Sequence, residues 1–230
     1  MKRLNNLFLL LLASLILMGC QQEKADPAPK QENKPSADKE DTSFSADDKV
    51  VTIDGKVLTY EDLQFHELMN KAEIELNRQQ DEQKLKGAEL EDKLAYWDEQ
   101  LQYHDNFNVN LSKMIEQYSM YLLAKEKGLD VTDGEVKKAI GEFEEKVQQY
   151  GPASELVKAY PEDAYQNRLK RYFTEKLLTV KIYETLETDV KREKPNAPEK
   201  EIAYDTTKKY EELYQSQIGS LDLKINAAGK

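Results

Sequence analysis

The 230-residue sequence contains one cysteine, Cys20, and two histidines, His66 and His104. A single thiol excludes an intramolecular disulfide and any site that needs several cysteine ligands. The histidines do not form an HExxH motif, and the sequence has neither a glycine-rich phosphate-binding loop nor a G-x-S-x-G nucleophile turn. We therefore expect a non-enzyme with no catalytic residues, no metal site, no bound nucleotide and no cofactor-binding residues.

Positive charge is also in short supply. The chain has 33 basic and 44 acidic residues, and its net charge is −11 at neutral pH. Such a protein lacks the basic surface that a phosphate backbone requires, so we expect no nucleic-acid partner. Only 5 of the basic residues are arginine. This excess of lysine indicates an AT-rich genome and hence a Gram-positive source.

Long hydrophobic runs are missing except at the N-terminus. Lys2 and Arg3 precede an apolar stretch over residues 7–18, and Gly19-Cys20 follows at once. The stretch is shorter than the roughly 20 residues that span a bilayer, but it has the length of a signal-peptide core. The pattern resembles a bacterial lipoprotein signal with its lipobox, which implies cleavage between Gly19 and Cys20 and a diacylglyceryl group on Cys20. A transmembrane anchor and an ordinary secretory signal are the alternatives.

Lipidation at Cys20 sets the expected location. One acyl chain binds a membrane only marginally, whereas two chains anchor a protein stably. We therefore expect a lipid-anchored protein on the extracytoplasmic face of the cell membrane, with membrane lipid as its partner through Cys20. Removal of residues 1–19 takes away two basic side chains and leaves a net charge of −13.

The sequence divides into a signal, a tether and one folded domain. Residues 1–19 are the predicted signal peptide, and 20–46 are the lipidated cysteine with a tether. The tether is rich in proline and charge, and Phe44 is its only large apolar residue, so we expect it to be disordered. A helical domain is expected over 47–226, followed by a tail at 227–230.

The domain is expected to be mainly α, elongated, with a small N-terminal β-hairpin and a C-terminal strand. Asp54-Gly55 suits the positive φ angles of a type I′ turn between two β-prone runs. Apolar residues then recur at helical spacing as far as about Val190, and residues 221–225 alternate as a strand does. We expect this strand to pair with the hairpin.

Particular residues predict where helices begin and end. Thr59 is expected to cap the first helix, and Thr132 with Glu135 forms the sequence of a capping box. Gly151-Pro152 is expected to end a helix. The stretch 71–90 has few large apolar residues and is expected to be an exposed arm.

Tyrosine and methionine are the side chains best suited to a binding surface on such a charged protein. Tyr has a polar tip on a large apolar ring, and Met adapts its shape. We expect Met114, Tyr118 and Tyr121 to line a concave client-binding surface with the helices on either side of Pro161. His104 continues an apolar stripe and is expected to be packed, whereas His66 is expected to be partly exposed.

The order of these motifs resembles the N-terminal chaperone domain of the SurA and PrsA foldases, and trigger factor has related architecture. Two segments carry the resemblance: IDGKVLTYEDL at 53–63 and AKEKGLDVTDGEV at 124–136. The resemblance implies a helical chaperone domain. In PrsA-like proteins a parvulin prolyl isomerase module follows the long helix, but here the interval at 191–198 is too short to hold one. We therefore expect no isomerase activity.

Two functions follow as hypotheses. The first is an ATP-independent chaperone-like lipoprotein that holds unfolded or secreted proteins as clients. The second is an accessory lipoprotein that binds one specific protein in envelope or spore assembly. The sequence leaves both open, since they differ in the breadth of their partners.

Overall fold

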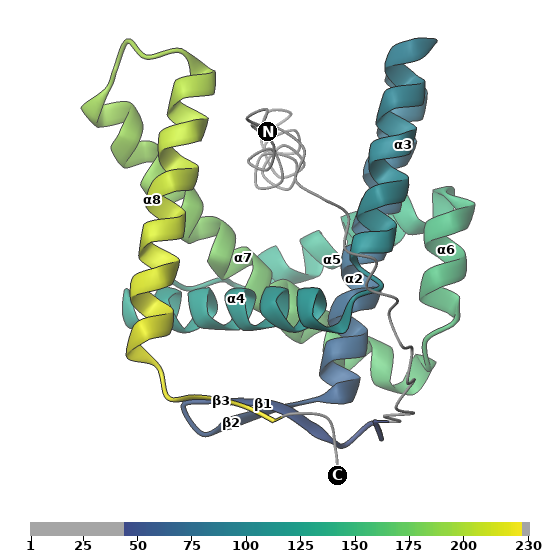
Figure 1. Cartoon of the computed structure of the whole chain (residues 1–230), viewed down its shortest axis with the longest axis horizontal. Coiled ribbons are helices and arrows are strands. Elements are labelled where there is room, and N and C mark those ends of the chain that lie inside the picture. Colours follow the sequence, from purple (N-terminus) through teal and green to yellow (C-terminus); the bar gives the residue numbers. More distant parts are fainter. Residues whose placement is uncertain (1–43, 227–230) are drawn as a thin grey trace, which may run out of the picture.

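The computed structural model describes residues 44–226, and within that range it is mainly helical with one small antiparallel sheet (Figure 1). This confirms the predicted class of helices with a minor β element. The sheet and helix α4 (Phe107–Glu126) form a base. Two helical arms rise from the same side of this base, one made by α2 and α3 and the other by α7 and α8 (Figure 1).

The sheet joins the two ends of the described chain. Strands β1 (Lys49–Ile53) and β2 (Lys56–Thr59) form a hairpin, and β3 (Leu223–Ile225) pairs with the other edge of β1. The turn residues Asp54 and Gly55 have φ angles of 46° and 79°. The predicted positive-φ turn and the predicted pairing of the C-terminal strand are both confirmed.

The first arm consists of α2 (Tyr60–Lys84) and α3 (Ala88–Tyr103), which pack against each other. The Thr59 hydroxyl accepts a hydrogen bond from the Asp62 amide at 3.3 Å, and the Asp62 carboxylate accepts one from the Thr59 amide at 3.0 Å. This reciprocal pair confirms the predicted cap and places a carboxylate in the first turn of α2.

The first arm is less exposed than its sequence indicates. All six residues from Ala72 to Asn77 are buried, because α2 packs against α3, α5 and α6 on different sides. Ile74 is 5% exposed and Leu76 is 7% exposed. Only the tip of the arm, around Lys84 and Gly87, is exposed, so the expectation of an exposed arm over 71–90 is wrong for most of its length.

Two further helices lie between the arms in sequence. The α5 helix (Asp133–Gln149) begins with the predicted capping box of Thr132 and Glu135. A short helix, α6 (Gly151–Lys158), follows at once. The prediction that Gly151-Pro152 ends a helix is confirmed, because α5 stops at Gln149. Proline has no N–H group, and the first turn of a helix does not need one for its hydrogen bonds. Pro152 is therefore also compatible with the start of the new helix α6.

The second arm is formed by α7 (Glu162–Glu193) and α8 (Glu199–Ser220). The prolines at 195 and 198 lie between the two helices. The first part of α7 belongs to the base, where α7 packs against α4 and α5, and its later part packs against α8.

Three apolar clusters hold these elements together. The first joins α2, α5, α6 and α7, and its most buried members include Met69, Leu169 and Phe173. The second packs the sheet against α4 and the start of α2. The third packs α4 against both helices of the second arm. The arms are thus tied to one base through α4 and α7.

Residues 44–46, which the sequence assigns to the tether, pack onto the domain. The Phe44 ring stacks between Tyr60 and Phe107, with ring centroids 4.9 and 5.2 Å away. The carbonyl of Ala46 also accepts a hydrogen bond from the amide of Glu61. The last residues of the predicted tether are therefore part of the domain.

Candidate functional site

The predicted lipidation site lies outside the described residues. Gly19 and Cys20 precede residue 44, so cleavage between them and lipidation of Cys20 stay predictions. Over residues 44–226, none of the helices combines the length and apolarity that a membrane span requires.

The three predicted client-binding residues lie on α4, in the base. Met114 is 5% exposed and packs with the sheet in the second apolar cluster, so it belongs to the core and is corrected as a surface residue. Tyr118 and Tyr121 are half-buried, with ring centroids 5.6 Å apart. Tyr118 packs against the second cluster and Tyr121 against the third.

The most concentrated set of charged side chains lies where α2, α4 and α7 meet. We call Asp62, His66, Arg168, Arg171 and Glu175 the junction cluster. The Asp62 carboxylate is 7% exposed and pairs with the guanidinium groups of both Arg168 and Arg171. Burial favours the neutral form of Asp62, but the Thr59 amide and these two cations outweigh it and lower its pKa. Asp62 therefore carries its charge inside the fold.

Two further ionisable groups of the junction cluster are shifted towards neutrality. Burial raises the pKa of Glu175 to about 7, even though Arg171 opposes the shift. Burial also lowers the pKa of His66 to about 3, helped by the positive charge of neighbouring groups. His66 is 6% exposed, and its Nδ1 lies 3.0 Å from Asn70 Nδ2. The expectation of a partly exposed His66 is wrong, because the base covers this face of α2.

The interior side of the junction cluster is narrow. Together with residues of α4 such as Met114, the cluster lines a cavity of about 20 Å³. A cavity of this size accommodates about one water molecule. On their outer side, Arg168 and Arg171 line a more open cavity of about 320 Å³ with Glu61. Because the ion pairs of Asp62 with both arginines join α2 to α7, we interpret the cluster as the polar joint of the base.

A second buried ion pair lies beside the junction cluster. Lys176 pairs with Glu73, and the Tyr172 hydroxyl donates to the same carboxylate at 3.4 Å. Burial raises the pKa of Tyr172 far above its usual value, so the phenol stays protonated as a donor. These groups fix the register of α7 against α2.

His104 closes the first arm onto α4. Its Nδ1 lies 2.8 Å from Asn110 Oδ1, and the Asn110 side-chain amide donates to the His104 carbonyl at 2.8 Å. His104 is packed, as predicted, and burial lowers its pKa. Among residues 44–226, no three His, Cys, Asp or Glu side chains are grouped so as to hold a metal ion.

The exposed aromatic side chains lie on the arms. Within the described part of the chain, the exposed large apolar side chains are Tyr103 on α3, Tyr204 on α8 and Ile225 on β3. The inner seam of the first arm is held by Trp97, which donates to Asp81 at 2.9 Å, and by further contacts of α2 with α3. The surface of the arms, and not the buried face of α4, is therefore the candidate contact surface.

Neither the junction cluster nor the tyrosines of α3 were singled out by the sequence analysis. One signal for the cluster is present in the sequence, since Arg168 and Arg171 are two of only 5 arginines and lie three residues apart. For α3, the signal is the spacing of Tyr96 and Tyr103, two helical turns apart.

Comparisons with known proteins find no relative. No family model, no curated protein and no solved structure matches the chain.

Proposed function

We propose that this protein is a lipid-anchored, extracytoplasmic chaperone-like protein that holds unfolded or secreted client chains without ATP. The observation that carries the proposal is the pair of helical arms rising on the same side of one base (Figure 1). Two arms offer a client contacts from two directions. The contacts with each arm can be weak, in the micromolar range, and a weak contact is readily released without an energy source.

The order of elements supports the resemblance to the SurA and PrsA chaperone domain. A hairpin leads into long helices, a capped corner joins α4 to α5, and the C-terminal strand returns to the hairpin. We propose that the fold is of this kind.

The short connection between α7 and α8 supports the proposal that the chain has no isomerase module. Between α7 and α8 there are five residues, 194–198, and both histidines are buried parts of the base. We propose that the protein acts by binding alone.

A specific protein–protein module is the second candidate, and one observation favours it. The exposed large apolar side chains of residues 44–226 are few and lie on three separate elements. A holdase that binds many clients is expected to expose a larger apolar surface than this. A specific module can bind its single partner through a few anchor residues.

The test of the proposal uses the mature chain from residue 20. Aggregation of an unrelated, chemically unfolded protein is followed by light scattering with increasing amounts of the mature chain and no nucleotide. Suppression at near-stoichiometric ratio supports a chaperone. Failure to protect any of several clients, with stable copurification of one envelope protein, supports the specific module.

Lipid anchoring to the membrane is tested separately in the native cell. The Cys20→Ala chain should lose lipid labelling, and it should be released from membranes or stay unprocessed. Normal lipid labelling of this variant contradicts the lipoprotein assignment.

A further inference from the structure

The outer face of α3 carries a stripe of alternating carboxylates and tyrosines. Asp92, Tyr96, Glu99 and Tyr103 follow each other at spacings of four, three and four residues. This spacing places all of them on one face of the helix. The opposite face, which includes Trp97, packs against α2. We call these four residues the α3 stripe.

The α3 stripe is open and its carboxylates are uncommitted. Tyr103 is 53% exposed, Tyr96 is half-buried, and both carboxylates are exposed. Over the described residues, the ion pairs include neither Asp92 nor Glu99. Asp98, on the side of α3 next to α2, is different because it binds Arg78 at 2.9 Å. The charges of the stripe are therefore free to meet a partner.

One ring of the stripe already receives a cation. The ammonium of Lys93 lies 5.4 Å from the centroid of the Tyr96 ring. This is the geometry of a cation–π contact, and Lys93 comes from the same helix. The contact shows that an ammonium can approach this ring, where a lysine or arginine of a client can take the same role.

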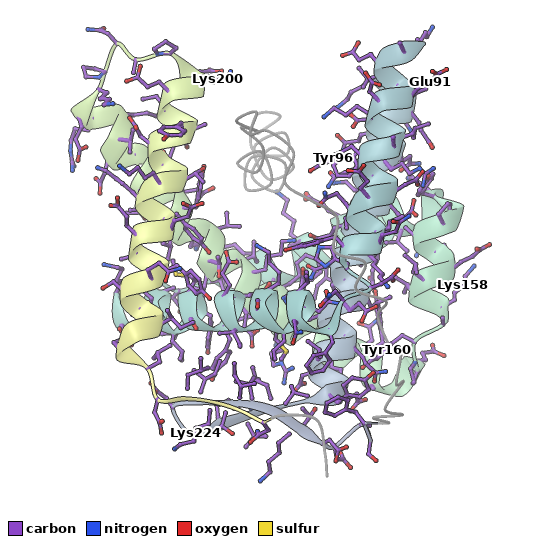
Figure 2. The ribbon with its side chains drawn as sticks, in the orientation of Figure 1. Glu91, Tyr96, Lys158, Tyr160, Lys200 and Lys224 are labelled. Carbon is purple, nitrogen blue, oxygen red and sulfur yellow. The ribbon has the colours of Figure 1, made fainter. Side chains whose placement is uncertain are left out.

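The stripe faces the second arm. Figure 2 draws Tyr96 on the side of α3 that is turned towards α8, and Glu91 on another side. Lys200 is drawn on the side of α8 nearer to α3, and the exposed Tyr204 lies one turn further along that face. A chain held on the stripe would thus have α8 as its second wall.

The net charge of α3 selects the sign of the occupant. The α3 helix contains five acidic residues and one basic residue, and α8 contains five acidic and three basic residues. A second copy of this chain carries the same negative net charge and is repelled. A membrane surface of anionic lipids is repelled for the same reason. A segment rich in lysine or arginine is attracted.

We propose that the α3 stripe binds positively charged segments of unfolded clients, through its carboxylates and the faces of its tyrosine rings. This inference rests on the proposed function and specifies which client chemistry the protein prefers. It also explains how a protein with few exposed apolar side chains can hold an unfolded chain. The tyrosines and carboxylates provide cation–π and ionic contacts in place of apolar ones.

The experiment measures binding of two fluorescent peptides to the mature chain. Both peptides have the same length and the same apolar and aromatic residues, but one carries lysine and arginine where the other carries glutamate. The basic peptide should bind and the acidic one should not. The double variant Asp92→Asn, Glu99→Gln should bind the basic peptide about fivefold more weakly. Raising the salt to 1 M shortens the screening length to about 3 Å. The affinity of the wild type for the basic peptide should then fall towards that of the variant.

A matched control removes the same charge elsewhere. Glu91 and Glu155 are exposed, and Glu91 lies on α3 but outside the stripe. The variant Glu91→Gln, Glu155→Gln should bind like the wild type, since it keeps the stripe. If both double variants lose affinity equally, general charge and not the stripe is responsible, and the inference is wrong.

The tyrosines are tested by a second pair of variants. Tyr103→Ala should weaken basic-peptide binding about threefold to fivefold, and Tyr103→Phe should retain most of it, because the ring face is kept. Circular dichroism confirms folding of each variant. Client protection that is unchanged by all stripe variants overturns this inference but leaves the proposed chaperone function standing. Absence of both client protection and peptide binding in the wild type overturns the proposed function itself.

Discussion

The junction cluster and the α3 stripe use similar side chains in opposite ways. In the junction cluster, Asp62 is buried and pairs with two guanidinium groups. In the stripe, Asp92 and Glu99 are exposed, and the ion pairs of residues 44–226 leave them out. The first carboxylate is buried and paired, and the other two are open to solvent.

The difference teaches where function can be placed on a highly charged helical protein. A buried ion pair holds helices in a defined register, and loss of one partner leaves an uncompensated charge in the interior. An exposed charge adds little to stability, so it can be kept for contacts with other molecules. We therefore assign structure to the junction cluster and binding to the stripe.

The largest expected effect is on the junction cluster. Asp62→Ala leaves Arg168 and Arg171 without their shared carboxylate and removes one of the two hydrogen bonds of the α2 capping box. We expect the free energy of unfolding to fall by about 3 kcal/mol. This is near the low end of the losses found when one partner of a buried ion pair is removed, because the Arg171 side chain is 40% exposed. Urea denaturation followed by circular dichroism measures the loss.

The equivalent substitution in the α3 stripe should affect stability much less. Asp92→Ala is expected to change the free energy of unfolding by less than about 0.5 kcal/mol, as is usual for an exposed site. Equal destabilisation by the two substitutions would show that the proposed division between structure and binding does not exist.

The next largest effect is a pH dependence that comes from Glu175. Its pKa is about 7 in the folded chain, compared with an ordinary value of 4.5. Between these values the folded state binds the proton and the unfolded state does not, so Glu175 contributes stability as pH falls from about 7.5 to 4.5. His66, with its lowered pKa, acts in the opposite direction below pH 6.5 and partly hides this gain.

Comparison with Glu175→Gln isolates the carboxyl group, because His66 is present in both proteins. The stability of the wild type relative to this variant should rise by about 2 kcal/mol between pH 7.5 and 5. Urea midpoints at four or five pH values give the curve. A difference that stays constant with pH would mean that Glu175 titrates normally in the folded protein.

A smaller loss of stability than at the junction cluster is expected at the start of the domain. Phe44→Ala removes two ring stacks, with Tyr60 and Phe107. Aromatic pairs contribute about 0.5–1.5 kcal/mol each, so a loss of about 1.5 kcal/mol is expected. A chain that starts at Asp47 should lose at least as much, because it also lacks the Ala46 carbonyl that accepts from the Glu61 amide. Wild-type stability in both would place Phe44 in the tether, as its sequence context suggests.

Local signals in the sequence predict much of the fold. The Asp54-Gly55 turn and the capping threonines act through their own backbones and near neighbours, so they are visible without tertiary structure. The alternation at residues 221–225 likewise predicts β3, although only the fold shows that it pairs with β1. Gly151-Pro152 marks the end of α5 correctly, but a proline can also begin a helix, and the sequence does not predict that α6 starts there.

The candidate site could be predicted only in part, because burial is a property of the assembled helices. Met114 and Tyr118 lie on the same helical stripe in sequence, but the sheet covers Met114 and leaves Tyr118 half-buried. His66 is enclosed by elements that are distant in sequence. The helical spacing of the α3 stripe is visible in the sequence. Its orientation towards α8 is not, because it depends on how α3 packs on α2.

Site-specific crosslinking tests the central claim most directly. A photoreactive amino acid is placed at position 103 in the stripe or at position 155 on α6, and the mature chain is mixed with an unfolded basic client. We expect crosslinks to the client from position 103, reduced by high salt, and few from position 155. Equal crosslinking from both positions, or none from position 103 while the client is still protected, would contradict the account.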